Sequence, residues 1–339
     1  MGSALARLQA GGFSIGIEAP LDNDWTPLGE QARRAAQRLP GEPDLQRHAE
    51  LARLADRLGF RALWVRDVPV YDPAFGDAGQ VFDPFVYLGY LAAHTRHIAL
   101  VTGSAIFTLR HPIDLAKSAA SLDRLSGGRL VMGIASGDRA VEFPAYGLAH
   151  DQRGERFAHS VDYFRQLLAQ GPATLRSPLG QMSGTQLLPQ PVTGRIPLIV
   201  TGSSRQSLQW LGEQADGWLT YPDATHTAQG PLRLAEKVRA WRSQIPNGGF
   251  RPHMTNEWID LDEDPDFPRT PLQGGYVLKT GRNGLIALLG EWKAAGVNHA
   301  ALGIQMARRP VDEVIQELAE EVLPLFPTLQ GPAPLAQGW

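Results

Sequence analysis

The sequence predicts an α/β fold, a closed (β/α)8 barrel that forms a single domain over residues 1–339. Three observations predict it. Short apolar runs typical of strands alternate with amphipathic helical patterns along the whole chain. There are eight runs and eight patterns, which fits a closed barrel better than an open doubly wound sheet of roughly five to seven strands. A chain of 339 residues with 43% hydrophobic content can also bury a large core.

The elements follow one another in a regular order. Strands are expected at residues 13–19, 62–68, 98–102, 130–135, 196–201 and 217–221, within 251–261, and at 299–305. Helices are expected near residues 44–59, 83–95, 114–126, 153–169, 203–215, 229–244, 281–295 and 311–324. In the third unit Pro112 suits a first helical turn, while Gly127 and Gly128 suit a left-handed stop before the strand at Leu130. The helical stripe of Leu285, Ile286, Leu289 and Trp292 similarly stops at Gly296.

Three segments interrupt the alternation. Residues 20–43, 170–195 and roughly 245–280 are long connections, and the second and third are rich in Gly, Pro and polar residues. We expect them to be loop excursions at the C-terminal face of the barrel. They are candidates for lids or for contacts between subunits.

Composition excludes several classes of function. The chain has no cysteine, so disulfides and thiolate metal sites are absent, and no metal site is predicted. A formal net charge of -3 with mixed signs argues against nucleic-acid partners and anionic membrane surfaces. No apolar run approaches the roughly 18 residues that a membrane span needs. Because no secretory signal opens the sequence, a cytoplasmic location is expected.

In a barrel of this kind the active site lies where the strands end, so the residues that follow each run are the candidates. They are Glu18, Arg66, Asp67, residues 103–106, 136–139 and 201–204, Tyr221 and Gln305. At the fifth strand Thr201, Gly202, Ser203 and Ser204 lead directly into a helical pattern. Backbone N–H groups, hydroxyls and the positive end of the helix dipole would meet there and bind an anion, most plausibly a phosphate.

The same residues have a second interpretation, in which Ser203 only caps its helix. Ser136 and Gly137 after the fourth strand could form another edge of the same pocket, although any tight turn favours such residues. No P-loop and no Gly-x-Gly-x-x-Gly run is present, so the sequence gives no support for a nucleoside triphosphate or for Rossmann-type binding.

Four segments carry a resemblance to a known family. They are "LGFRALWVRD", "GSAIFTLRHP", "LDRLSGGRLVMGIASGD" and "IPLIVTGSSRQSLQWLGEQADGWL", in this order and on successive predicted units. Together they resemble the bacterial-luciferase-like superfamily of flavin-dependent oxidoreductases, over roughly residues 13–325. The resemblance implies a TIM barrel, usually homodimeric, that binds FMN or the related deazaflavin coenzyme at the C-terminal mouth.

The resemblance also assigns residues. Thr201, Gly202, Ser203 and Ser204 match the family's phosphate-binding turn, and Ser136 and Gly137 match the turn that reaches the phosphate and the ribityl chain. Luciferase has an arginine where Ser136 stands, so Arg139 or Arg205 would have to supply the charge. Gly103 and Ser104 match a bulge that often carries a non-prolyl cis peptide under the flavin ring in relatives.

The catalytic assignment is less complete. Luciferase places a histidine after the second strand, whereas this chain has Arg66 and Asp67. Asp67 could be a base, could orient substrate or could pair with Arg66. Glu18 could be an acid or base if it is buried against the flavin, or could lie at the surface. His111 matches a family position, but its place before a helix suggests a structural role.

The resulting expectation is a flavin-dependent monooxygenase, in which reduced FMN and oxygen oxygenate a small organic substrate. A separate NAD(P)H-dependent reductase would deliver the reduced FMN. Ile106, Trp218 and Leu219 could shield the reaction, and residues 170–195 could close over it. The alternatives are a deazaflavin-dependent dehydrogenase or reductase and a non-catalytic flavin-binding protein. Sulfonates, alkanes, aldehydes, amines and heterocycles all remain open as substrates.

Overall fold

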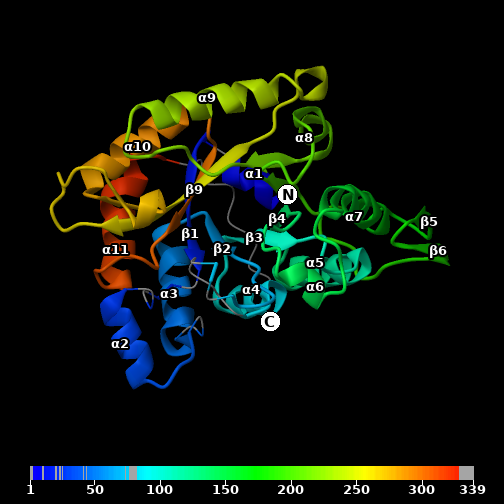
Figure 1. Ribbon diagram of the computed structural model, residues 1–339, viewed down its shortest axis with the longest axis horizontal. Coiled ribbons are helices and arrows are strands. Elements are labelled where there is room, and N and C mark those ends of the chain that lie inside the picture. The colour runs from blue at the N-terminus through cyan, green and yellow to red at the C-terminus, as the bar shows by residue number, and fades with distance from the viewer. Residues whose placement is uncertain are drawn as a thin grey trace.

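The computed structural model confirms the predicted (β/α)8 barrel (Figure 1). It describes residues 3–327 except residues 10, 20, 23, 25, 41, 43, 73 and 76–81. The barrel strands are β1 (Ser14–Ala19), β2 (Ala62–Val65), β3 (Ala99–Ile106), β4 (Leu130–Ala135), β7 (Leu198–Thr201), β8 (Gly217–Leu219), β9 (His253–Leu261) and β12 (His299–Gly303). Neighbouring strands are parallel, and pairing of β8 with β9 closes the circle.

Helices surround the strands on the outside. The barrel helices are α3 (Leu45–Leu58), α4 (Pro84–His94), α5 (Pro112–Leu125), α7 (Arg153–Leu167), α8 (Leu208–Gln214), α9 (Gln229–Arg242), α10 (Arg282–Ala294) and α11 (Val311–Glu317). Three further helices are α1 (Ala4–Gln9), α2 (Pro27–Ala35) and α6 (Glu142–Ala145). No helix in the described part of the chain is long and apolar enough to cross a membrane.

Alternation along each strand divides the core into two layers. On β1, Ile15 and Ile17 belong to the cluster between strands and helices, while Gly16 and Glu18 alternate with them on the inner side. Inside the barrel a second cluster contains Trp64 of β2 with Leu5 and other residues of α1. Because α1 packs into this inner cluster, it closes the N-terminal end of the barrel, and the opening lies where the strands end.

A buried polar chain fixes α1 to the barrel. His299 Nε2 accepts a hydrogen bond from the Trp64 indole at 3.0 Å, so its Nδ1–H donates to Ser14 Oγ at 2.7 Å. Ser14 in turn donates to the carbonyl of Leu8 at 2.6 Å. Burial lowers the pKa of His299 to about 3, so the ring is neutral and can make both contacts.

The segment 170–195 forms a hairpin of β5 (Ala173–Ser177) and β6 (Gly180–Thr185), which extends outward at the right of Figure 1. It lies along the outer side of α5 and α7 instead of over the strand ends. The ring of His111, which caps α5, donates to the Leu179 carbonyl at 2.7 Å. Farther along α5, Arg124 donates to the Gln190 carbonyl at 2.6 Å. The expected closure over the barrel mouth is therefore wrong for this segment, and His111 has the structural role.

The other two excursions contain regular structure. Beyond β9, residues 262–280 include β10 (Thr270–Leu272) and β11 (Val277–Thr280). β11 pairs in parallel with the last residues of β9, past the point where β8 ends. The segment 20–43 contains α2, which begins at its N-cap Thr26 and projects at the lower left of Figure 1. Residues 20, 23, 25, 41 and 43 of this excursion lie outside the described residues.

Candidate active site

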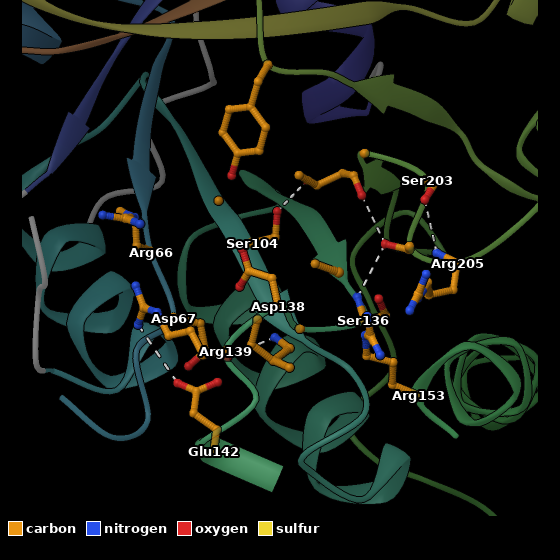
Figure 2. Close-up of a pocket in the computed structure, with 18 residues that line it drawn as sticks. Arg66, Asp67, Ser104, Ser136, Asp138, Arg139, Glu142, Arg153, Ser203 and Arg205 are labelled. Atoms are coloured by element: carbon orange, nitrogen blue, oxygen red, sulfur yellow. Dashed lines mark hydrogen bonds and ion pairs between the residues drawn. The ribbon is translucent and has the colours of Figure 1, made fainter. Parts of the chain in front are cut away.

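A cavity of about 290 Å³ opens at the C-terminal ends of β2, β3, β4, β7 and β8 (Figure 2). It brings together all the predicted cofactor-binding residues and Asp67, but Glu18 is not in its lining. The lining residues are Arg66, Asp67, Gly103, Ser104, Ile106, Ala135, Ser136, Gly137, Asp138, Arg139, Glu142, Arg153, Thr201, Gly202, Ser203, Ser204, Arg205 and Tyr221.

The turn after β7 has an unusual backbone. Gly202, Ser204 and Arg205 have φ angles of 57°, 44° and 63°. Two consecutive non-glycine residues in the left-handed region are strained, so other contacts must hold them. The Ser204 hydroxyl donates to the Thr201 carbonyl at 2.9 Å and accepts from the Ser136 amide at 3.3 Å. One hydroxyl therefore holds the turns after β4 and β7 together.

The helix after this turn begins later than expected. Its N-cap is Ser207, whose hydroxyl accepts from the Trp210 amide at 3.1 Å, and α8 starts at Leu208. The prediction that the helix begins at Ser203 is therefore wrong, and so is the alternative that Ser203 caps it. Ser203 instead accepts a hydrogen bond from the Arg205 amide at 3.2 Å. Within the described residues the amide N–H groups of Ser203 and Ser204 have no hydrogen-bond partner.

Trp218 holds the turn after β7 by a hydrogen bond to its backbone. It packs between strands and helices next to Trp241, and its indole donates to the Gly202 carbonyl at 2.7 Å. Leu219 belongs to the inner barrel cluster. The expectation that these two residues shield the reaction is wrong, because neither lines the cavity, whereas Ile106 does.

Four arginines line the cavity: Arg66, Arg139, Arg153 and Arg205. Arg153 and Arg205 lie next to Ser136 and Ser203 in Figure 2. Burial and the positive charge of Arg205 both lower the pKa of Arg153. A Cβ at Gly154 would lie 2.8 Å from Arg205 Cβ, so a glycine is needed there. Arg205 was one of the two predicted sources of positive charge. Arg153 was not predicted, because it lies at the start of α7 and does not follow a strand.

Arg139, the other predicted source, is oriented differently. Its guanidinium lies 4.5 Å from the Phe75 ring centroid and 3.8 Å from Glu142, the contact drawn as a dashed line in Figure 2. Burial raises the pKa of Glu142 to about 7, and its Oε1 has no hydrogen-bond partner within the described residues. Sequence reasoning missed Glu142, because it belongs to the short helix α6 and not to a strand end.

The bulge expected after the third strand lies within β3, which continues to Ile106. The peptide bond between Gly103 and Ser104 is cis, and the register between β3 and β4 shifts between Thr102 and Ala105. The Thr102 hydroxyl donates to the Gly133 carbonyl at 2.7 Å. A Cβ at Gly103 would lie 2.8 Å from the Trp64 ring, so only glycine allows this close approach. Gly103 and Ser104 both line the cavity.

Asp67 makes an ion pair, but with a different partner than expected. Its carboxylate binds the guanidinium of Arg110 through both oxygens, with an Nη2–Oδ1 distance of 2.9 Å. It also accepts the amide N–H of Ile106 at 2.9 Å. Arg66, the expected partner, instead lies 5.2 Å from the Trp258 ring centroid. Since both oxygens of Asp67 are already hydrogen-bonded, the geometry favours the ion-pair interpretation over a catalytic base.

Glu18 is buried at the end of β1, which excludes the surface alternative. Its oxygens accept hydrogen bonds from Asn256 Nδ2 at 3.0 Å and from Trp258 Nε1 at 2.8 Å. Burial raises the pKa of Glu18, although the nearby charge of Arg66 acts against this shift. Glu18 and Glu142 are therefore the two carboxyl groups near the barrel mouth for which burial favours the protonated form.

On β9, between Asn256 and Trp258, burial raises the pKa of Glu257 to about 8 from an ordinary value of 4.5. Between these values the unfolded chain ionises while the folded protein keeps the proton, so this group makes the protein less stable as pH rises. We expect Glu257→Gln to remove this pH-dependent loss. Relative to the parent, the variant's free energy of unfolding should rise by on the order of 2–4 kcal/mol between pH 5 and pH 8.5. Urea unfolding of both proteins at the two pH values tests this. Equal pH dependence in both proteins would contradict it.

Comparison with known proteins agrees with this geometry. An uncharacterised protein of Mycobacterium tuberculosis is 32% identical over 207 residues, which cover 57% of this chain and 73% of the relative. The monooxygenase RslO1 from Streptomyces bottropensis has a similar fold, with a TM-score of 0.72 and 20% identity over 93% of this chain and 100% of that chain. A secondary alcohol dehydrogenase dependent on F420, crystallised with an F420–acetone adduct, gives a TM-score of 0.71 and 19% identity over 93% and 99% of the two chains. The family model for luciferase-like monooxygenases matches residues 27–245, and the chain therefore belongs to the luciferase-like monooxygenase family.

Proposed function

We propose that this oxidoreductase is an FMN-dependent monooxygenase, which uses reduced FMN and oxygen to oxygenate a small organic substrate. One observation supports it above all. The two turns joined by Ser204, together with Arg153 and Arg205, form an anion site at one side of a strand-end cavity. The bulge at Gly103 and Ser104 lines the same cavity.

The residues present fit a phosphate. The amide groups of Ser203 and Ser204 are without partners in the described structure, and the Ser203 hydroxyl lies beside them. Consecutive N–H groups in a left-handed turn form a concave site for anions. Arg153 and Arg205 add charge-assisted hydrogen bonds, which are stronger than neutral ones. The charge that Ser136 cannot provide is thus supplied by these two arginines.

When bound, reduced FMN would supply the electrons that activate oxygen, and the protein would supply position and a controlled environment. The turns after β4 and β7 would hold the phosphate, and the Gly103–Ser104 bulge would support the ring. Ile106 would contribute an apolar surface beside it. Glu18, whose pKa is raised by burial, would hold or deliver a proton on the substrate side.

A deazaflavin-dependent dehydrogenase is the second candidate, because a buried proton-holding carboxyl such as Glu18 would also serve hydride transfer. A polyglutamyl tail on that coenzyme would favour a basic groove outside the phosphate site. The arginines of the first excursion give little support for such a groove. Arg34 pairs with Glu30 at 2.5 Å, and Arg38 pairs with Asp24 at 2.6 Å. Their charge is neutralised locally, which supports FMN.

A spectral titration of the purified protein with FMN, and in parallel with the deazaflavin coenzyme, tests the proposal. We expect tight binding of FMN and weak binding of the deazaflavin. With a flavin reductase and NAD(P)H added, oxygen uptake should equal product formation once a substrate is found. Preference for the deazaflavin would favour the dehydrogenase. Binding of FMN without any turnover would favour a non-catalytic flavin-binding protein.

The partners of the proposed enzyme stay predictions. A separate reductase is needed because the reaction consumes reduced FMN, and a homodimer follows from the family resemblance alone. A solution mass of one chain would contradict the homodimer.

A further inference from the structure

Three carboxyl groups share the cavity lining with the arginines, namely those of Asp67, Asp138 and Glu142. They come from the end of β2, the turn after β4 and the helix α6. In Figure 2 Glu142 lies on the opposite side of the view from Ser203, and Asp138 lies between them. An anion that binds in this cavity therefore adds negative charge to a wall that already contains acidic side chains.

The three carboxyl groups differ in whether they can take up a proton. Arg110 binds both oxygens of Asp67, so neither oxygen is left for a proton. Asp138 is exposed, so water stabilises its charge. Glu142 is only 1% exposed, and its Oε1 has no hydrogen-bond partner in the described part of the chain. Of the three, Glu142 is the carboxyl that combines burial with an available oxygen.

The contacts of Glu142 stabilise its charged form incompletely. The backbone N–H of Val70, in the loop after β2, forms a hydrogen bond with the carboxyl group. The nearest cation is Arg139, whose Nη1 lies 3.8 Å from Oε1, which is longer than a hydrogen bond. A buried oxygen without a donor is more costly on a carboxylate than on a neutral carboxyl group. Glu142 can therefore accept a proton without losing a direct hydrogen bond at Oε1.

Charged and titratable groups face Glu142 from each neighbouring element. They are Arg139 and Asp138 in the turn after β4, Asp67 after β2, and Tyr146 at the end of α6. Burial is the main reason why the pKa of Glu142 rises to about 7. Arg139 acts against this rise, whereas the charges of Asp67 and Asp138 add to it. Near neutral pH both forms of Glu142 are therefore populated, and a further negative charge would favour the protonated form.

Asp138 connects Glu142 with the anion site electrostatically. Its negative charge acts on the Arg153 guanidinium and also on the Glu142 carboxyl group. A dianion held by Arg153 and Arg205 would cancel their positive charge, so the charges of Asp138 and Glu142 would be less compensated. Salt screens such interactions less in a partly buried cavity than at the surface. Binding of the dianion should therefore make the ionised form of Glu142 less favourable.

We propose that Glu142 takes up a proton from the solvent when a phosphate or sulfate dianion binds at the turns after β4 and β7. Glu142 then changes from a carboxylate to a carboxylic acid, and the cavity gains one negative charge less. Such coupling is reciprocal, so ionisation of Glu142 must weaken anion binding by the same factor. The inference rests on the proposed function only for identifying the natural anion as the phosphate of FMN.

Sulfate is a suitable probe because it stays doubly charged between about pH 6 and pH 8.5. We expect the sulfate Kd of the parent to rise over this range by about fivefold more than that of Glu142→Gln, which has no charge to gain. NMR titration at both pH values measures this. Glu257→Gln is the matched control, because it removes a buried carboxyl group whose pKa is also raised but which does not line the cavity. This control should keep the pH dependence of the parent.

The parent protein alone provides a second test, which does not depend on how the variant folds. On addition of sulfate at pH 7, infrared difference spectra should gain the C=O band of a protonated carboxyl group. Calorimetry of FMN binding in two buffers with different ionisation enthalpies counts the protons that are exchanged. The parent should take up about 0.3–0.5 more protons per FMN than Glu142→Gln, because a group with a pKa near 7 is half protonated before binding.

Two results would overturn the inference. One is an equal pH dependence of sulfate binding in the parent and Glu142→Gln, and the other is an infrared spectrum of the parent without the new band. Loss of the pH dependence in Glu257→Gln would also contradict the assignment to Glu142. The proposed function fails separately. Coupled sulfate binding without any FMN binding would support the role of Glu142 and contradict FMN, whereas FMN binding with equal proton uptake in both proteins would do the reverse.

Discussion

Replacing Arg153 and Arg205 together with alanine should weaken FMN binding by about 100-fold or more. Each guanidinium would make a hydrogen bond to a charged phosphate, and such bonds contribute about 1.5–3 kcal/mol each. Both side chains line the cavity next to the turns after β4 and β7. The loss should therefore fall on the phosphate and not on the ring.

Riboflavin, which lacks the phosphate, provides the internal comparison. Calorimetric titration should show similar riboflavin affinity in the parent and the double variant, whereas FMN affinity falls. Arg195→Ala is the matched control, because this exposed arginine pairs with Asp216 outside the cavity. Equal loss for riboflavin and FMN would mean that the variant disturbs the ring site, and a change below threefold would move the phosphate elsewhere. Added salt should reduce the difference in FMN affinity between the parent and the double variant, since salt screens the charges.

The barrel itself could be predicted because its strands are buried on both sides. β4, with the sequence LVMGIA, is a continuous apolar run between glycine-rich turns, and β7 is similar. The hairpin strands could not be found in this way. β6 has the sequence GQMSGT and is mostly exposed, so it has neither an apolar run nor a regular alternation. Its strand conformation depends on pairing with β5 and on contacts with α5.

For the site, the strand-end rule found the residues on β3, β4 and β7, because parallel strands end at one edge. It could not find Arg153 and Glu142, which reach the cavity from helices. The sequence also did not indicate which charged residues form ion pairs. Asp67 binds Arg110, which lies 43 positions away, and not the adjacent Arg66. Both residues follow the end of β2, and the partner of Asp67 comes from the connection between β3 and α5, which no local sequence pattern indicates.

The sequence also did not give the register of β9 against its neighbouring strands. The seventh strand was expected somewhere within residues 251–261, which does not tell which side chains face the interior. The structure shows that Asn256 and Trp258 face Glu18, while Glu257 alternates with them. A one-residue slip would exchange these two sets, so the contacts of Glu18 with Asn256 and Trp258 follow only from the pairing of β9 with β12.

Arg129→Met should produce the largest loss of stability, about 3–5 kcal/mol in the free energy of unfolding. Arg129 is 5% exposed, and its guanidinium binds backbone carbonyls instead of a carboxylate. It donates to the carbonyls of Ala92 at 2.9 Å, Thr95 at 3.1 Å, Ile98 at 3.1 Å and Ser126 at 2.8 Å. These carbonyls lie at the ends of α4 and α5 and at the start of β3, so one side chain satisfies several buried acceptors at once.

Burial lowers the pKa of Arg129 to about 10, so the group is still charged at neutral pH. Arg129→Lys should recover only part of the stability, because one ammonium group has three donors and cannot span the same carbonyls. Arg124→Met is the matched control, since this exposed residue near the end of α5 donates to a single carbonyl, that of Gln190. Urea unfolding of the three variants measures the difference. A loss below 1 kcal/mol for Arg129→Met would mean that water can replace the guanidinium, and that the ends of α4 and α5 do not depend on it.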